Sequence, residues 1–166
     1  MIKYSLKIFG IKGFMIKVLF VCLGNICRSP MAQYVLQQMV DEYGLSDNFV
    51  IDSAATESYN EMCHAGIYYG TRELLNAKRI PFKEHYSRQI RKKDYEYFDY
   101  IIAMDDSNIR DIQSLIGPDT EHKIRRLLDY TDHPRNIKDP WYTGNFEEAY
   151  QDIVEGCQAF LDFLKL

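Results

Sequence analysis

The chain alternates short, continuous apolar runs with longer stretches in which apolar residues recur at helical spacing. Runs rich in Val, Ile, Leu and Phe indicate buried parallel strands, and they occupy residues 16–22 (IKVLFVC), 49–54 (FVIDSA) and 100–104 (YIIAM). The helical pattern covers residues 30–43, 70–78, 106–115 and 146–164. Strands that alternate with helices predict an α/β fold. We expect a single domain, a three-layer sandwich whose parallel sheet is flanked by helices.

The ends of the first predicted helix are marked by residues with strong positional preferences. Ser29 stands directly before Pro30, and serine is a favoured N-cap whereas proline suits the first helical turn. Gly44 is a good C-terminal stop. We therefore expect this helix to begin at Pro30, with Ser29 as its N-cap.

The stretch before Met15 lacks the features of a targeting or membrane segment. A signal peptide needs an unbroken apolar stretch and a small-residue cleavage site, whereas Lys12 and Lys17 interrupt this one. No apolar stretch reaches the length of a membrane span. We interpret residues 1–14 as an extension or an upstream start and residues 15–166 as the domain. A cytoplasmic protein without a membrane partner is expected.

The composition agrees with a globular domain that has no nucleic-acid partner. Hydrophobic residues make up 46% of the 166 residues, which excludes compositional disorder. The net charge is only −4, with both signs mixed along the chain. A nucleic-acid footprint needs a basic stripe, and none is visible. A local basic pocket for one phosphate group remains compatible with this charge.

The four cysteines do not form a pattern typical of disulfides or zinc. They are Cys22, Cys27, Cys63 and Cys157. A chain of this length with this many core residues does not need disulfides to fold. Four residues separate the first two cysteines and no matching second pair follows, so a zinc site is not indicated. His64 beside Cys63 favours a surface or packing role, because adjacent side chains rarely converge on one ion.

The segment that follows the first strand carries the clearest chemistry. Cys22 ends the strand, five residues follow, and Arg28 and Ser29 then precede a helix. Backbone amides of such a loop converge on one point, and the helix N-terminus adds a positive dipole there. Arg28 offers a planar fork to phosphate oxygens. The same field favours a reactive thiolate at Cys22, which Ser29 is placed to support by a hydrogen bond.

A second candidate lies far along the chain, in the sequence KDPWY. Pro140 restricts Asp139 to an extended conformation, which presents the carboxylate from a loop as an acid for a leaving oxygen. Trp141 and Tyr142 are suited to stack on an aromatic substrate. When this segment is taken alone, an ordinary Asp-Pro turn explains it better. For the loop, the alternative is a buried structural cysteine beside a surface arginine.

These segments together resemble the low-molecular-weight protein tyrosine phosphatases. The resemblance runs nearly end to end from Lys17, and its order and spacing are specific. It rests on VLFVCLGNICRSPMA (18–32), DSAAT (52–56), SRQI (87–90), FDYIIAMDDSNIRDI (98–112), DPWYTG (139–144) and the C-terminal helix.

The resemblance implies a four-stranded parallel sheet with helices on both faces and hydrolysis of phosphotyrosine through a cysteinyl-phosphate. Cys22 is then the nucleophile, Arg28 binds the phosphate, and Asp139 is the general acid and later the base that activates water. No metal or organic cofactor is implied. The expected partners are phosphotyrosine proteins, with inorganic phosphate as the product. We expect a monomer or a weak homodimer.

Further residues match positions that support or surround the family's site. Four match its loop-supporting network: Asn25, Ser29, Ser53 and His85. The remaining loop residues are expected to bind substrate: Leu23, Gly24, Ile26 and Cys27. Tyr59, Trp141 and Tyr142 match aromatic positions of the pocket wall. In relatives the counterpart of Cys27 traps the nucleophile as a disulfide.

The chain also departs from the family pattern in places, and two other functions are alternatives to a phosphatase. Residues 60–71 (NEMCHAGIYYGT) lack the usual proline- and aspartate-containing pattern, and Arg79 stands where a glycine is common. Arsenate reductases of the same fold need further resolving cysteines, which are missing between Cys63 and Cys157. A phosphotyrosine-binding module without catalysis is expected to lack Cys22 or Asp139. The basic run at 91–93 is interpreted as a solvated helix face.

Overall fold

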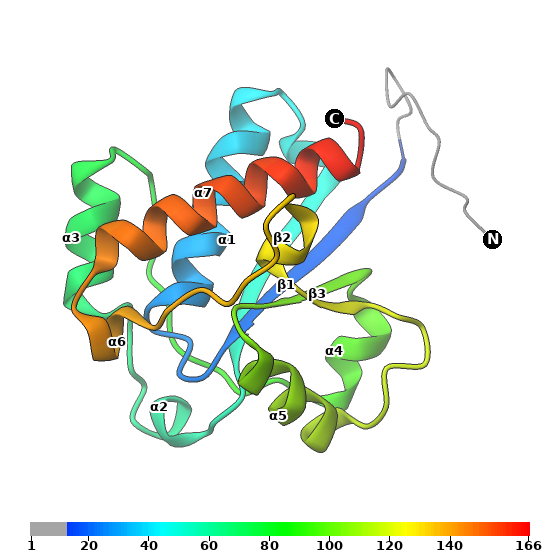
Figure 1. Cartoon of the computed structure of the whole chain (residues 1–166), viewed down its shortest axis with the longest axis horizontal. Coiled ribbons are helices and arrows are strands. Elements are labelled where there is room, and N and C mark those ends of the chain that lie inside the picture. Colours follow the sequence, from blue (N-terminus) through cyan, green and yellow to red (C-terminus); the bar gives the residue numbers. More distant parts are fainter. Residues whose placement is uncertain (1–12) are drawn as a thin grey trace.

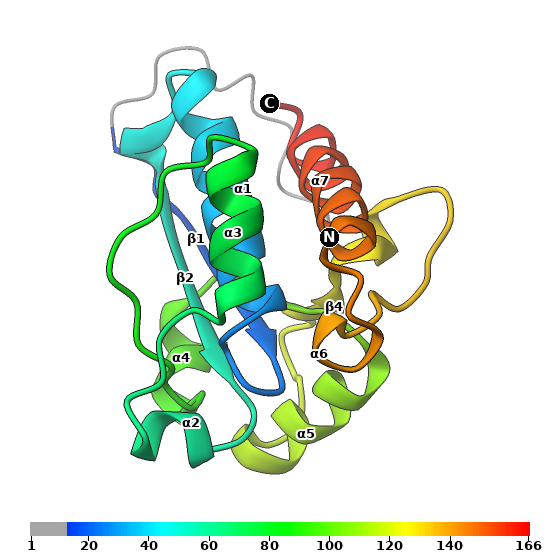
Figure 2. The ribbon, with the colours of Figure 1, turned by 90° about the vertical axis from the view of Figure 1, so that its left-hand side faces the viewer.

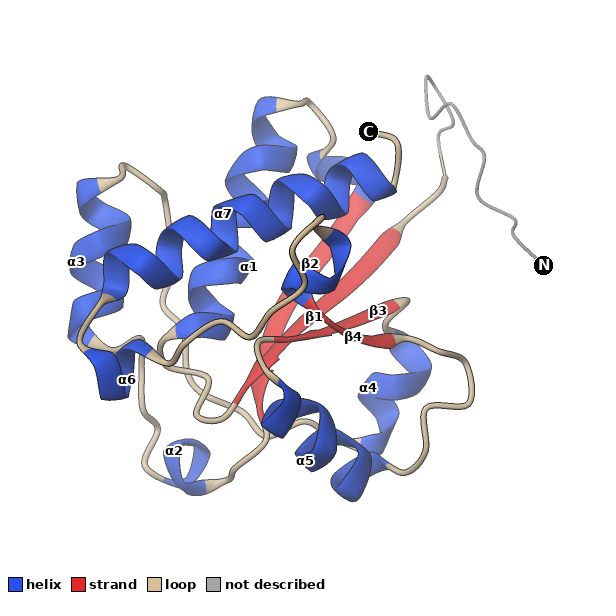
Figure 3. Ribbon diagram, in the orientation of Figure 1, coloured by secondary structure: helices blue, strands red, loops and turns tan. Residues whose placement is uncertain are grey.

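Four parallel strands form one sheet in the order β2-β1-β3-β4. The computed structural model describes residues 13–166, so the predicted extension over residues 1–14 falls almost wholly outside the described residues. The strands are β1 (Ile16–Cys22), β2 (Phe49–Ala55), β3 (Tyr100–Ala103) and β4 (Ile124–Arg126). The expected α/β fold with a parallel sheet is confirmed (Figure 3).

Both faces of the sheet are covered, which makes the fold three-layered. Val18 and Phe20 of β1 belong to the core on one face, while Leu19 and Val21 belong to the core on the other. All four side chains are fully buried. Burial on both faces explains why β1 is a nearly continuous apolar run, as is typical of parallel strands covered on both sides.

The helices divide between the two faces (Figures 1 and 2). One side holds α1 (Arg28–Glu42), α3 (Tyr69–Ala77) and α7 (Phe146–Phe163). The other holds α4 (Lys92–Tyr97) and α5 (Asp106–Ile116). Shorter elements complete the chain: η1 (Ser46–Asn48), α2 (Tyr59–Met62), η2 (Leu127–Tyr130) and α6 (Pro140–Thr143). Among the described helices, none has the length and apolar character to cross a membrane.

The predicted start of the first helix is wrong by two residues. Helix α1 begins at Arg28, and its N-cap position is held by Cys27, so Ser29 is not the N-cap. Pro30 falls within the first turn, where its missing N–H costs no intrahelical bond. The Ser29 hydroxyl contacts Cys22 instead of capping the helix.

The carboxyl ends of β1, β2 and β3 open onto one edge of the sheet, where loops in parallel α/β folds build ligand sites. Cys22 ends β1, and its carbonyl accepts a hydrogen bond from the backbone of Thr56, just after β2. Asp105 lies two residues after the end of β3. The fold therefore brings two chain segments, distant in sequence, to the loop that joins β1 to α1.

Candidate active site

The loop between β1 and α1 encloses the Cys22 sulfur. The Sγ atom lies 3.2 Å from the backbone nitrogen of Asn25, which donates to it, and 3.0 Å from the Ser29 hydroxyl oxygen. Only 3% of Cys22 is exposed. The N-terminus of α1 begins six residues later and adds a positive dipole. These groups stabilise negative charge on the sulfur.

Asn25 holds the loop in shape from the inside. Its φ of +54° lies in the left-handed region, which asparagine tolerates better than most residues. The side-chain amide donates to Ser29 Oγ at 2.8 Å and to Ser53 Oγ at 2.9 Å. The ring nitrogen Nε2 of His85 lies 3.0 Å from the Asn25 carbonyl oxygen. Burial lowers the pKa of His85, so this ring is mostly neutral at neutral pH.

Arg28 is buried, and the three nitrogens of its guanidinium differ in their partners. Nη1 donates to Asp105 Oδ2 at 2.6 Å and to the Ile137 carbonyl at 2.8 Å. Nη2 lies 3.2 Å from Asp139 Oδ2. Within the described residues, Nε is buried and makes no hydrogen bond. Among the described residues, Nε is therefore the guanidinium nitrogen left without a partner, whereas Nη2 is engaged by Asp139.

Asp105 was not predicted as a site residue. Its Oδ2 pins Arg28, while Oδ1 accepts from the Asn108 backbone and so caps α5. Burial raises the pKa of Asp105, but hydrogen bonds from Ser107 and Arg28 outweigh burial and hold this pKa below its ordinary value. Its place just after a parallel strand is the sequence signal that indicates a site residue.

Asp139 is fixed at the start of α6. Its backbone is extended ahead of Pro140, as predicted, and its side chain caps the helix by accepting from the Trp141 backbone nitrogen at 3.0 Å. The other carboxylate oxygen faces Arg28. Arg28 and Asp139, 111 positions apart in the sequence, thus meet at the mouth of the loop, and 18% of the Asp139 side chain is exposed.

A cavity of about 260 Å³ lies over the loop, and the three predicted catalytic residues, Cys22, Arg28 and Asp139, line it. Its lining includes most of the predicted residues: Cys22, Leu23, Gly24, Ile26, Cys27, Arg28, Tyr59, Asp139, Trp141 and Tyr142. Glu57 and Asn60 complete it. The other four predicted residues, Asn25, Ser29, Ser53 and His85, lie behind the loop in the network of hydrogen bonds.

Aromatic side chains form the rim of this cavity. Tyr59, Trp141 and Tyr142 are 66%, 54% and 76% exposed, although they line the cavity. Tyr68, which was not predicted, packs edge-on against Trp141 with ring centroids 4.9 Å apart. Its backbone nitrogen also donates to the Ile26 carbonyl at 2.8 Å. Tyr68 therefore joins the rim to the loop.

The remaining cysteines differ from Cys22 in their surroundings. Burial raises the pKa of Cys27 to about 12, so this thiol stays protonated at neutral pH. Cys157 is fully buried in the core, and burial raises its pKa too. Cys63 is exposed. Across residues 13–166, no cluster of three or more His, Cys, Asp or Glu side chains is arranged to hold a metal ion.

Comparison with known proteins identifies the family. Residues 17–166 match the model of the low molecular weight phosphotyrosine protein phosphatases. YfkJ of Bacillus subtilis, a low molecular weight protein-tyrosine-phosphatase, is 43% identical over 151 residues, which are 89% of this chain and 94% of that protein. The Homo sapiens low molecular weight phosphotyrosine protein phosphatase is 42% identical over 87% of this chain and 93% of its own length.

Solved structures agree with this match. The crystal structure of Bacillus subtilis YfkJ has a TM-score of 0.85 at 42% identity and covers 93% of this chain and 97% of its own. A Drosophila arginine phosphatase has a TM-score of 0.79 at 34% identity, covering 91% of this chain and 99% of its own. The chain therefore belongs to the low molecular weight phosphotyrosine protein phosphatases and is a hydrolase of phosphoric monoesters.

Proposed function

We propose that this phosphatase hydrolyses phosphotyrosine in proteins through a cysteinyl-phosphate on Cys22 and releases inorganic phosphate. The observation that carries the proposal is the pairing of two features in one cavity. The Cys22 sulfur accepts a hydrogen bond from the Asn25 backbone nitrogen and lies 3.0 Å from the Ser29 hydroxyl oxygen. Arg28 lines the same cavity, and its Nε has no partner among the described residues. A nucleophile and an anion clamp side by side suit attack on a phosphoryl group.

In the first step, the Cys22 thiolate attacks phosphorus and the bond from phosphorus to the phenolic oxygen breaks. Asp139 donates its proton to that oxygen, so the product leaves as neutral tyrosine. Arg28 and the loop amides hold the equatorial oxygens, with bidentate geometry from the guanidinium. The cysteinyl-phosphate that remains is the proposed intermediate.

In the second step, Asp139 takes a proton from water, and the water oxygen attacks phosphorus. The phosphorus–sulfur bond breaks, and Cys22 leaves as a thiolate. Ser29 Oγ, 3.0 Å from the sulfur, donates a hydrogen bond to that thiolate. Because a thiolate has no hydrogen to donate, the Ser29 hydroxyl must be the donor in this contact, and its other acceptor, the Ala54 carbonyl oxygen, is farther away at 3.4 Å.

The exposed rings of Tyr59, Trp141 and Tyr142 favour an aryl substrate at the mouth. A cysteine at the bottom of the cavity is reached by a long phosphotyrosine side chain more easily than by short phosphoserine. One structural neighbour is named an arginine phosphatase, so phosphoarginine is the informative competing substrate. We propose that phosphotyrosine is the better substrate of the two, because its ring stacks on the aromatic rim.

The mechanism is tested with Cys22→Ser and Arg28→Lys. Cys22→Ser should abolish turnover but keep phosphate binding, because the loop and Arg28 are unchanged. Arg28→Lys should also be severe, since a point charge does not replace the fork. Steady-state rates on phosphotyrosine and phosphoarginine peptides, with phosphate binding by calorimetry, give the readouts. Near-wild-type turnover by Cys22→Ser would overturn the assignment of the nucleophile.

A further inference from the structure

The loop around Cys22 is held from outside by residues 85–88, of which only His85 belongs to the predicted supporting network. Three groups of residues 85–88 contact the loop: the His85 ring at the Asn25 carbonyl, the Ser87 hydroxyl at the Gly24 carbonyl, and the Arg88 backbone nitrogen at Asn25 Oδ1. The last two distances are 2.9 Å and 3.2 Å. We call residues 85–88 the brace.

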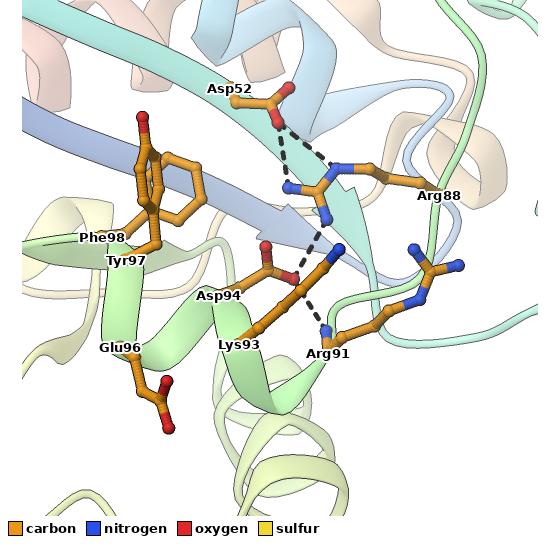
Figure 4. Close-up of a pocket in the computed structure, with 8 residues that line it drawn as sticks. All are labelled: Asp52, Arg88, Arg91, Lys93, Asp94, Glu96, Tyr97 and Phe98. Carbon is orange, nitrogen blue, oxygen red and sulfur yellow. Dashed lines mark hydrogen bonds and ion pairs between the residues drawn. The ribbon is translucent and has the colours of Figure 1, made fainter.

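The brace is anchored through both the backbone and the side chain of Arg88. Its carbonyl accepts from the Ala55 nitrogen at 2.7 Å, at the end of β2. Its guanidinium donates to Asp52 Oδ2 of β2 at 2.9 and 3.3 Å, and to Asp94 Oδ2 of α4 at 3.0 Å. Figure 4 shows this guanidinium between the two carboxylates, one from the strand and one from the helix. Arg88 thus joins the sheet, α4 and the loop.

The Arg88 backbone nitrogen also fixes which way the Asn25 amide faces. A backbone N–H only donates, so the group it meets on Asn25 must be the oxygen. The amide NH₂ must then face the two serine hydroxyls, and it donates to Ser29 Oγ and Ser53 Oγ. Ser29 Oγ accepts there, and its own hydrogen has two acceptors within reach, Cys22 Sγ at 3.0 Å and the Ala54 carbonyl oxygen at 3.4 Å. A thiolate at Cys22 has no hydrogen to donate, so the shorter contact is then a hydrogen bond from Ser29 to the sulfur. The order of donors runs from Arg88 through Asn25 and Ser29 to the sulfur.

We propose that Arg88 is a positioning residue that, held by Asp52 and Asp94, keeps Asn25 oriented so that Ser29 donates to Cys22. The inference rests on the proposed role of Cys22 as the nucleophile. The cavity beside α4, about 670 Å³, surrounds this ion-paired arginine and is lined by Arg91, Lys93, Glu96, Tyr97 and Phe98 as well. Within this cavity the Arg88 guanidinium is already ion-paired with Asp52 and Asp94.

The two possible roles of Arg88, stabilising the fold or positioning Ser29, predict different effects on turnover when Arg88 and Ser29 are substituted together. If Arg88 acts through Ser29, its loss removes an interaction that Ser29→Ala has already removed. The two substitutions are then non-additive, as expected for residues in one hydrogen-bond network. If Arg88 only stabilises the fold, its effect on turnover is the same whether residue 29 is serine or alanine.

The experiment is a double-mutant cycle with Arg88→Met and Ser29→Ala in the full chain. Readouts are kcat and KM on an aryl phosphate and the alkylation rate of Cys22 by iodoacetamide in mildly acidic buffer. In the parent chain, Arg88→Met should lower kcat and the alkylation rate by about tenfold, the size of one lost hydrogen bond to a charged group. KM should change by less than about twofold, since Arg28 still binds phosphate. In the Ser29→Ala background the loss should shrink to below about threefold.

Arg135→Met is the matched control, because Arg135 also bridges two carboxylates, Asp152 and Glu155 at 2.7 Å each, on the surface. Its alkylation rate should equal that of the parent. If Arg88→Met fails to fold by circular dichroism, Asp52→Asn replaces it in the cycle, since it weakens the anchor and keeps the shape. Equal losses in the two backgrounds would overturn the proposal. Turnover by Cys22→Ser would instead overturn the proposed function, so the two failures are distinguishable.

Discussion

Replacing Asp105 with asparagine tests how the protein aims Arg28. The carboxylate Oδ2 lies 2.6 Å from Arg28 Nη1, with 3% of the arginine and 19% of the aspartate side chain exposed. Asparagine is as good an N-cap as aspartate, so α5 keeps its cap. Asparagine has a single side-chain oxygen, so when that oxygen caps α5 the amide NH₂ faces Arg28 Nη1 and the hydrogen bond to Arg28 is lost.

The size of the loss follows from this single bond. A hydrogen bond to a charged group contributes about 1.5–3 kcal/mol. The amide NH₂ that replaces Oδ2 is a donor, so it cannot accept from Arg28. The loss is then about 1.5–3 kcal/mol, which corresponds to about 10- to 150-fold in rate or affinity. We expect kcat/KM on an aryl phosphate to fall, and the inhibition constant of inorganic phosphate to rise, by about that factor.

Asp106→Asn is the control, since Asp106 is the next residue and pairs with Arg126 at 3.2 Å with 55% of its side chain exposed. An exposed ion pair contributes little, and the change should stay below about twofold. Unchanged phosphate inhibition in Asp105→Asn would refute the idea that Asp105 aims the guanidinium.

The same substitution has a pH signature in stability. The pKa of Asp105 is below its ordinary value in the folded protein, so its carboxylate stabilises the fold above the ordinary carboxyl pKa. That contribution is lost as the pH falls through the depressed folded value. The difference in melting temperature between the parent and Asp105→Asn should therefore be largest near neutral pH and shrink in acid. A difference that does not vary with pH would contradict this assignment.

Three further predictions address the acid, the rim and the cysteines. Asp139→Asn should slow hydrolysis of phenyl phosphates by about 10²–10⁴-fold in steady-state kinetics. The loss in rate should be smaller for substrates with better leaving groups. An equal loss across leaving groups would indicate a structural role for Asp139. Tyr59→Ala should narrow the preference for phosphotyrosine over phosphoserine peptides in kcat/KM, and an unchanged ratio contradicts the role of the rim. Peroxide should oxidise Cys22 to a sulfenic acid, which the Cys27 thiol converts to a disulfide with loss of water. Thiol reductants should therefore restore activity in the parent but not in Cys27→Ala. Peptide mass mapping detects the disulfide between Cys22 and Cys27. Full recovery of activity in Cys27→Ala would refute the idea that Cys27 protects Cys22 from irreversible oxidation.

The sequence predicted those parts of the site that are local. Cys22 ends a buried strand and Arg28 stands six residues later at the start of a helix, so the spacing indicates an anion site when it is combined with its strand and helix context. Asp139 needed the family resemblance, because nothing within the KDPWY segment shows that it folds back 111 residues to meet Arg28. Asp105 was missed because DDSN reads as an ordinary helix start. One carboxylate oxygen of Asp105 caps α5, which is a local contact. The other accepts from Arg28, 77 positions away in the sequence, and local sequence does not indicate that contact.

The missed elements have equally physical reasons. Strand β4 has only three residues, Ile124–Arg126, of which two are arginines, so it shows no apolar run. Its place in the sheet depends on pairing with β3. Ser29 was expected as an N-cap because serine there is a common helix signal. The structure places its hydroxyl 3.0 Å from the Cys22 sulfur instead, which local sequence preferences do not describe.

The most direct test of the central claim is to trap the phosphoryl group on the chain. The parent and Asp139→Ala should be mixed with an aryl phosphate that has a good leaving group, quenched in acid within one turnover, and digested for mass spectrometry. We predict that one phosphoryl group is added to the peptide that carries Cys22, and that more accumulates in Asp139→Ala because the base for the second step is absent. The same experiment on Cys22→Ser should give no labelled peptide. Turnover without a labelled Cys22 peptide, or a label on another residue, would contradict the account.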